Sequence, residues 1–212
     1  MNQQRYNNYN PKIAERFRGF LPVVIDVETG GLEPKTDALL ELAAITIDCD
    51  QEGIFRPVDS IHFHIEPFKN ANLDPKSLQI TGIDPFHPFR FAVSEKDMLD
   101  RLFEFLKKAQ RQTNCSRSIL VGHNSWFDLS FLNAAMVRNN VQKSPFHKFT
   151  SIDTSTIGMM MVGHTVLAEA LKRANIDFDS GSFHSALYDA TKTAEFFCKS
   201  LNSLPWPTHQ SP

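Results

Sequence analysis

The chain reads Leu21-Pro22-Val23-Val24-Ile25-Asp26-Val27-Glu28 near its start, an apolar run that carries two carboxylates at its end. A short apolar run followed by a turn, here at Gly30-Gly31, is typical of a strand inside a sheet. Residues two apart in a strand project from the same face, so Asp26 and Glu28 point the same way. Because an unpaired buried carboxylate is costly, the pair either binds a partner or caps the glycine turn.

Further strands and helices follow this first strand. Leu39–Ile47 is rich in Ile and Leu, and Ser60–Glu66 alternates apolar and polar residues. Three successive strands with short connections predict an antiparallel meander, and a fourth, short strand is expected at Ser118–Val121. Ser94 is a candidate helix N-cap, and helices are expected at residues 75–80, 95–111, 127–139, 165–175 and 185–201. This order of elements predicts an α/β domain with a mixed sheet flanked by helices.

Composition limits the class of protein. The 212 residues suit one domain, expected over residues 16–203, between a flexible N-terminus at 1–15 and a flexible tail at 204–212. Three widely spaced cysteines indicate neither a disulfide framework nor a zinc knuckle, and they favour the cytoplasm. No apolar stretch is long enough to span a membrane, and no leader opens the chain. With a net charge of −2, a nucleic-acid partner would have to be held by local basic patches.

Two later motifs place acidic residues at the starts of predicted helices. Asn124-Ser125-Trp126-Phe127-Asp128 follows the strand at 118–121, and catalytic groups often gather where a strand ends. An Asp at a helix start can equally be a cap. In His184-Ser185-Ala186-Leu187-Tyr188-Asp189, a helix that begins near Ser185 leaves His184 in the loop and turns Asp189 toward the sheet. A lone histidine, however, is more often structural than catalytic.

Taken together, these four acids and one histidine predict a metal-dependent site. Four carboxylates at one place would repel one another unless cations lay between them. Oxygen ligands of this kind suit Mg²⁺, with Mn²⁺ as a possible substitute, rather than zinc. Two such ions about 3.5–4 Å apart can activate water and stabilise the leaving oxygen in phosphodiester cleavage. A neighbouring histidine can accept the proton of that water at neutral pH.

The motifs DxE, NxxFD and HxxxxD, in this order, resemble the DEDDh exonucleases, the DnaQ-like group of the ribonuclease H-like superfamily. Ile65-Glu66-Pro67 and Ile80-Thr81-Gly82-Ile83 also resemble segments of that family, and the likeness runs from about Arg16 to Asn202. It implies a ribonuclease H-like α/β fold, with a mixed central β-sheet of three antiparallel strands plus parallel strands. It also implies two Mg²⁺ ions with Asp26 bridging them, at a metal site formed by Asp26, Glu28, Asp128, His184 and Asp189. Of these residues, His184 would be the general base, and Asp128 is counted with it as catalytic.

Within this family the chain is most similar to a branch that trims RNA. The segments Phe20–Thr29, Lys35–Glu41 and Phe178–Asp189 are especially alike. The branch implies a magnesium-dependent 3′→5′ exoribonuclease that trims the 3′ ends of tRNA, including its CCA end, and of other stable RNAs. It would release 5′-monophosphates and also act on single-stranded DNA. A proofreading subunit of a DNA polymerase, an oligoribonuclease and a catalytically silent nucleic-acid binding module remain the alternatives.

The resemblance also assigns residues that contact the substrate. Phe127 and Phe149 match aromatic positions that stack on the terminal bases, and Asn124 belongs to the same substrate-binding set. At three other positions of this set the chain departs from the branch: two aromatic residues are replaced by Leu32 and Ile80, and an acidic residue by Lys76. Leucine and isoleucine have no π-face, so base stacking there is lost.

A cluster of phenylalanines follows these positions. Phe86, Phe89 and Phe91 could supply substitute faces for the missing aromatic residues, although packing within the loop is the expected role. The branch discriminates against 3′-terminal cytosines. Because two stacking positions and the acidic position are changed, we expect this discrimination to be blunted here, unless the phenylalanines compensate.

Basic residues occur in local groups. The resemblance implies that they form a patch on one subunit that feeds RNA to the active site of the other subunit of a homodimer. For residues 107–111 a solvated helix face explains the charges equally well. The groups are Arg16 and Arg18, then Lys107, Lys108, Arg111 and Arg117, then Lys143 and Lys148.

Overall fold

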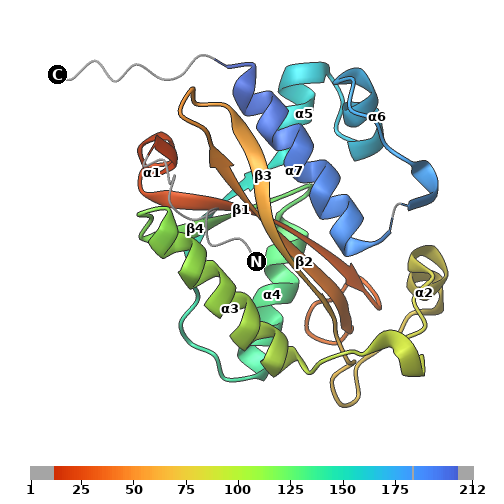
Figure 1. Cartoon of the computed structure of the whole chain (residues 1–212). Coiled ribbons are helices and arrows are strands. Elements are labelled where there is room, and N and C mark those ends of the chain that lie inside the picture. Colours follow the sequence, from red (N-terminus) through yellow and green to blue (C-terminus); the bar gives the residue numbers. More distant parts are fainter. Residues whose placement is uncertain (1–11, 183, 205–212) are drawn as a thin grey trace.

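The computed structural model describes residues 12–182 and 184–204, and a five-stranded mixed sheet forms its centre (Figure 1). The strands are β1 Phe20–Thr29, β2 Leu39–Cys49, β3 Phe55–His64, β4 Arg117–Gly122 and β5 Phe146–Asp153. They lie in the order β3-β2-β1-β4-β5. β1 pairs antiparallel with β2, and β2 with β3, which confirms the predicted meander. β1 runs parallel to β4, and β4 to β5, so the carboxyl ends of these three strands meet at one edge.

The burial of each strand follows its place in the sheet. β1 and β2 lie inside the sheet and bury almost every side chain, which explains their nearly continuous apolar sequences. β3 and β5 are the edge strands and leave many side chains partly or fully exposed. β5 was not predicted, because its sequence Phe-His-Lys-Phe-Thr-Ser-Ile-Asp lacks apolar alternation and its strand structure depends on pairing with β4.

Helices cover both faces of the sheet (Figure 1). Their bounds are α1 Lys12–Arg16, α2 Pro75–Thr81, α3 Glu95–Gln112, α4 Trp126–Arg138, α5 Thr154–Val162, α6 Leu167–Arg173 and α7 Ala186–Asn202, with 3-10 turns η2 Pro88–Arg90 and η3 Ser180–Ser182. On one face, Arg101 of α3 lies over the ring of Phe63 in β3, 5.0 Å from its centroid. On the other face, the Ala186 N–H at the start of α7 donates to Glu41 of β2. Glu28 of β1 is the direct cross-strand partner of Glu41, so both side chains lie on the face that α7 covers. Asp26, two residues before Glu28, shares this face.

The predicted helices are present, with ends that differ by one or two residues. Ser94 caps α3, its hydroxyl accepting the Asp97 N–H at 3.1 Å. The apolar face of α3 is fully buried, at Met98, Leu99, Leu102 and Leu106. α5 was not predicted. Its start could have been recognised from Asp153, whose side chain caps the helix by accepting the Ser155 N–H.

Within the described residues, helix α1 packs onto the sheet ahead of β1. α1 lies within the segment expected to be flexible, yet its Ile13 is fully buried in the main core. Residues 1–11 of that segment, and residues 205–212 of the expected tail, lie outside the described part of the chain. Within the part that is described, no helix is long and apolar enough to cross a membrane.

Candidate active site

Three elements bring the four predicted carboxylates to the carboxyl end of β1. Asp26 and Glu28 project from the same face of β1, while Asp128 lies in the first turn of α4 and Asp189 in the first turn of α7. The four charges act on one another, since Asp128, Glu28 and Asp189 all disfavour ionisation of Asp26. Residues from distant parts of the sequence therefore form one acidic cleft.

Asp128 reaches β1 because β4 ends in a glycine. Its carboxylate accepts hydrogen bonds from the Val27 N–H and from its own backbone N–H. A Cβ at Gly122 would lie 3.0 Å from Asp128 Oδ2 and 3.1 Å from the Ser125 Cα. Any side chain at position 122 would push against the carboxylate, so the small residue at the end of β4 helps to position Asp128.

His184 lies in the loop before α7, as predicted. Its backbone is in the left-handed region, with φ of 70°, and its N–H donates to Asp189 Oδ2 at 3.0 Å. The side chain is exposed, and one of its ring nitrogens lies within 4.8 Å of carboxylate oxygens of Glu28 and Asp189. The hydrogen bond thus fixes the backbone of His184 to a neighbouring acid while the ring stays accessible to the cleft.

The cleft disfavours ionisation of its acids. Burial is the main cause that raises the pKa of Asp26, and the charges of Asp128, Glu28 and Asp189 add to it. Burial also raises the pKa of Asp128 and of Asp189. The pKa of Glu28 is raised to about 8 by burial and by the charges of Asp189 and Glu41. A cation between these groups would favour their ionised forms and lower the pKa values.

The donor atoms fit a divalent metal ion. Oδ1 of Asp189 is buried and has no hydrogen-bond partner among the described residues. Leaving a buried carboxylate oxygen without a partner costs free energy, which a bound cation would offset. Oxygens of Glu28 and Asp189 lie together with a ring nitrogen of His184. Carboxylate-rich sites of this kind favour hard cations.

The predicted aromatic contacts differ in their surroundings. Phe127 is half-buried, with its ring centroid 4.9 Å from that of Phe131. Phe149 projects from β5 with 84% of its side chain exposed. Asn124 has a left-handed φ of 67°, and its N–H donates to Asp153 Oδ1 at 3.1 Å. Phe149 therefore offers an open ring face, while Phe127 is held against the core beside Asp128.

The three positions that depart from the family pattern lie at the surface near the end of β1. The backbone N–H of Asp74, the N-cap of α2, donates to the Gly30 carbonyl at 2.6 Å and so fixes α2 beside this end. Leu32 is 79% exposed and Ile80 is 63% exposed, and Lys76 on α2 is exposed as well. Both apolar side chains are thus available for contact, without a π-face.

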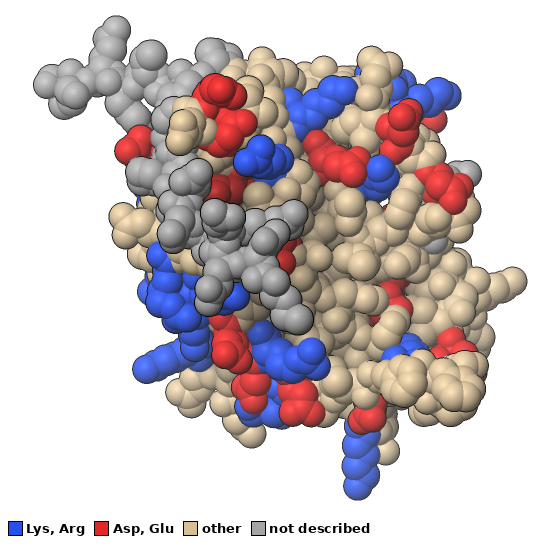
Figure 2. All heavy atoms as spheres, in the orientation of Figure 1, with Lys and Arg blue, Asp and Glu red and all other residues tan. Residues whose placement is uncertain are grey.

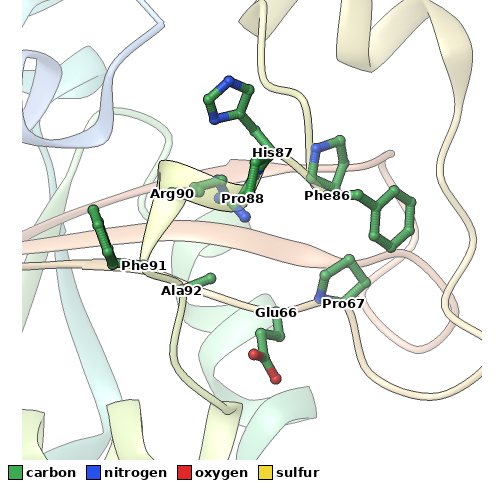
Figure 3. Close-up of a pocket in the computed structure, with 9 residues that line it drawn as sticks. Glu66, Pro67, Phe86, His87, Pro88, Arg90, Phe91 and Ala92 are labelled. Atoms are coloured by element: carbon green, nitrogen blue, oxygen red, sulfur yellow. The ribbon is translucent and has the colours of Figure 1, made fainter.

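The packing expected for Phe86, Phe89 and Phe91 is wrong. Their side chains are 75%, 75% and 81% exposed, because η2 is a short turn that leaves them no core to enter. We call residues 83–93, which carry them, the aromatic loop. It borders a cavity of about 460 Å³, and Phe86 and Phe91 project from opposite ends of the turn (Figure 3).

The aromatic loop is fixed next to the carboxylate cleft. The guanidinium of Arg90 donates to the carbonyls of Ile65, at 3.0 Å, and Leu40. Leu40 precedes Glu41, which acts electrostatically on both Arg90 and Glu28. Arg90 therefore anchors the aromatic loop to the strand ends on the β2–β3 side of the acids.

The predicted basic residues lie at the other end of the strands. Arg117 opens β4 and pairs with Phe20 at the start of β1, and Arg18 lies 5.2 Å over the Phe20 ring. Lys and Arg side chains gather on the left of the view in Figure 2, over the end of α3. From Phe20, where β1 begins, to Asp26 the extended strand spans roughly 20 Å. The remaining members are Arg16 at the end of α1, Lys107, Lys108 and Arg111 in the last part of α3, Lys143 in the loop before β5 and Lys148 in β5.

Four polar residues beside the cleft were not predicted. Glu41 is a charged residue inside the apolar run of β2, just as Asp26 is inside that of β1. This break in the apolar pattern could have identified Glu41 from the sequence. His62 and His64 are two apart on β3, and both contact Glu41. Asp153 accepts the N–H groups of residues 124 and 125 and so holds the turn before α4.

Comparison with known proteins gives the family. The family described as Exonuclease matches residues 23–197. A ribonuclease T of Shewanella denitrificans is 52% identical over 90% of this chain and 84% of its own length. A ribonuclease T of Vibrio parahaemolyticus is 50% identical over 92% of this chain and 94% of its own length.

Solved structures share the fold at low identity. The nuclease domain of 3'hExo, a DEDDh family member bound to rAMP, has a TM-score of 0.69 and 19% identity over 86% of this chain and 92% of that domain. E. coli Exonuclease I in complex with a dT13 oligonucleotide has a TM-score of 0.67 and 18% identity over 87% of this chain and 41% of its own. These likenesses confirm the predicted ribonuclease H-like mixed sheet. The family match and the identity to the curated relatives agree with the DEDDh motifs: the chain belongs to the ribonuclease T family of exonucleases.

Proposed function

We propose that this 3′→5′ exonuclease trims the 3′ ends of transfer RNA and other stable RNAs, using two Mg²⁺ ions and releasing 5′-monophosphates. The family implies the use of a divalent metal and a nucleic-acid substrate. The choice of Mg²⁺ rests on the oxygen-rich donor set. RNA as the substrate is supported by the name of the relatives, ribonuclease T, at about half identity over nearly the whole chain.

One observation carries the proposal: four buried or half-buried carboxylates converge on a cleft with one oxygen of Asp189 left without a partner. Asp26, Glu28, Asp128 and Asp189 would hold the ions. When bound, the ions supply the positive charge that stabilises the pentavalent phosphate and its leaving oxygen. Without cations, the same arrangement would only cost stability. Burial raises the pKa of each acid, and repulsion between carboxylates adds to the raised pKa of Asp26, Glu28 and Asp128.

His184 would act as the general base. Its exposed ring reaches the cleft, and its backbone is tied to Asp189, so the ring can accept a proton from the attacking water at one nitrogen. Proton transfer of this kind is worth about 10²–10⁴ in rate. The proton then leaves to solvent, to which the ring is open.

Aromatic side chains would hold the terminal bases. Phe149 offers an exposed face and Phe127 lies beside Asp128, while stacking on an aromatic ring is worth about 1–3 kcal/mol per base. Leu32 and Ile80 give apolar contact only. We propose that the aromatic loop, through Phe86 and Phe89, replaces part of the lost stacking and leaves discrimination against terminal cytosines blunted.

The proposed working form is a cytoplasmic homodimer with one catalytic domain over residues 16–203 in each subunit. Arg117 pairs with Phe20 and Arg18 lies over the Phe20 ring, roughly 20 Å of extended strand away from Asp26. An RNA strand bound to this basic group would reach the cleft of a partner subunit more easily than that of its own. The dimer also agrees with the closed symmetry common among soluble oligomers.

The test follows a single-stranded RNA and a transfer RNA with an intact CCA end, both labelled at the 5′ end. We expect labelled products that shorten stepwise in Mg²⁺ and none in excess chelator. Asp26→Asn and Asp189→Asn should abolish this shortening yet keep the circular dichroism spectrum, because each removes one repelling charge. Asp100→Asn, on the exposed face of α3, is the matched control. Activity of either cleft variant within about tenfold of the parent would refute the two-metal proposal.

A further inference from the structure

A second group of metal-binding side chains lies on the sheet next to the cleft. Glu41 of β2 and the two histidines of β3, His62 and His64, place one ligand atom each within 4.8 Å of one another. Glu41 and His64 are direct cross-strand partners, and His62 is two residues before His64, so all three project from one face. His64 Nδ1 lies 2.9 Å from Glu41 Oε1, and His62 Nε2 lies 3.3 Å from Glu41 Oε2.

We propose that Glu41, His62 and His64 form a binding site for a transition-metal dication such as Zn²⁺, separate from the catalytic Mg²⁺ site. Two imidazole nitrogens and one carboxylate oxygen are a ligand set that zinc and its neighbours prefer, and a fourth position is left for water. Bonds of about 2.0–2.1 Å at tetrahedral angles separate ligand atoms by roughly 3.4 Å. The separations of 2.9 and 3.3 Å from Glu41 lie slightly below this value, and all three ligand atoms are within 4.8 Å of one another, so side-chain rotations would close the site around an ion.

The surroundings suit an ion at this position. The Ala186 N–H donates to Glu41 Oε2 at 3.3 Å and so orients the carboxylate, as second-shell donors do in metal sites. Burial would raise the pKa of Glu41, but the hydrogen bond from His62, the charges of both histidines and the Ala186 N–H outweigh it and lower the pKa. A bound dication would take the place of the histidine charges, because the imidazoles must be neutral to coordinate it. The His64 side chain is 40% exposed, which leaves a path from solvent.

The two sites are neighbours that prefer different ions. Glu41 pairs with Glu28 across the strands, so the proposed site lies about one strand spacing, ~5 Å, from the catalytic acids. The catalytic cleft offers mainly carboxylate oxygens, which favour Mg²⁺, whereas the new site offers imidazoles, which Mg²⁺ binds poorly. A simple ion pair of Glu41 with protonated histidines is the competing account of the same contacts, and only metal binding separates the two.

The test uses Co²⁺, whose visible spectrum reports nitrogen ligands and tetrahedral geometry. The full chain carrying Asp26→Asn and Asp189→Asn, in which two of the four catalytic acids are neutral, is titrated with Co²⁺ so that the catalytic site contributes less. A parallel titration of the parent in excess Mg²⁺ covers the case that the double variant fails to fold. We expect one Co²⁺ per chain with intense visible bands, displaced by Zn²⁺ but not by Mg²⁺.

Substitution of the ligands completes the test. His64→Ala and His62→Ala should each weaken Co²⁺ binding roughly a hundredfold or more, since each removes a direct ligand. His164→Ala, at a half-buried histidine whose ring accepts the Val166 N–H, is the matched control and should bind as the parent does. Absence of stoichiometric Co²⁺, or binding that survives His64→Ala, would overturn the proposal. Because the readout is metal binding, its failure is distinct from any failure of the nuclease proposal.

Discussion

Glu28→Gln should stabilise the metal-free protein, and the effect should grow with pH. Burial and the charges of Asp189 and Glu41 raise the pKa of Glu28 from 4.5 to about 8. A raised pKa means that the folded protein holds a proton that the unfolded chain releases. The stability that the protonated Glu28 contributes is fully present below pH 4.5 and is lost as the pH rises toward 8.

The size of the effect follows from the shift. At 1.36 kcal/mol per pKa unit, complete ionisation of Glu28 costs the folded state at most about 5 kcal/mol, and about 3 kcal/mol at pH 7. Glutamine has nearly the same shape and no charge, so it removes this cost. For a chain of this length, a gain of about 3 kcal/mol corresponds to a Tm increase on the order of 10 °C.

The assay is thermal unfolding in chelator across roughly pH 5 to 8, followed by circular dichroism. The parent should lose Tm as the pH rises, and Glu28→Gln should lose much less. Glu104→Gln, on the exposed face of α3, should follow the parent. In Mg²⁺ the parent should have the higher Tm of the two, because the ions stabilise the parent by mass action whereas Glu28→Gln lacks one ligand. A Glu28→Gln variant that is no more stable than the parent at pH 8 in chelator would refute the crowded-carboxylate argument.

Four further predictions concern catalysis and RNA binding. His184→Ala should lose about 10²–10⁴ in turnover while Mg²⁺ and RNA binding persist, and near-full turnover at pH 7 would make His184 structural. Arg18→Glu with Arg117→Glu should weaken RNA binding and lower its salt dependence by about 0.7 per lost phosphate contact, in a protein that sediments as a dimer; a fully active monomer would contradict this. On single strands ending in A or in CC, the rates should differ little, whereas a strong stall at CC would count against blunted discrimination. Phe86→Ala and Phe89→Ala should each weaken end binding by about 1–3 kcal/mol, and unchanged binding would remove the aromatic loop from the substrate path.

The sequence by itself determined the local features of the catalytic cleft. The apolar runs of β1 and β2 predict buried strands, and Asp26 stands out because it interrupts one of them. The spacing of His184 and Asp189 predicts a loop residue followed by a helical one, and α7 begins accordingly at Ala186. Such features can be inferred because they depend on residues close together in the chain, whose periodicity and turn chemistry are local.

Only the tertiary structure decided which distant residues meet and which remain exposed. β5 is a strand because β4 offers it a parallel partner, not because its own sequence alternates. Phe86 looks like a core residue in the sequence, and it is exposed because Arg90 ties the aromatic loop across the strand ends without giving its rings a core. Glu41 meets His64 through strand register, which a single sequence does not reveal. Register, edge pairing and loop anchoring are non-local interactions, and they set the surroundings of the cleft whose acids the motifs alone had predicted.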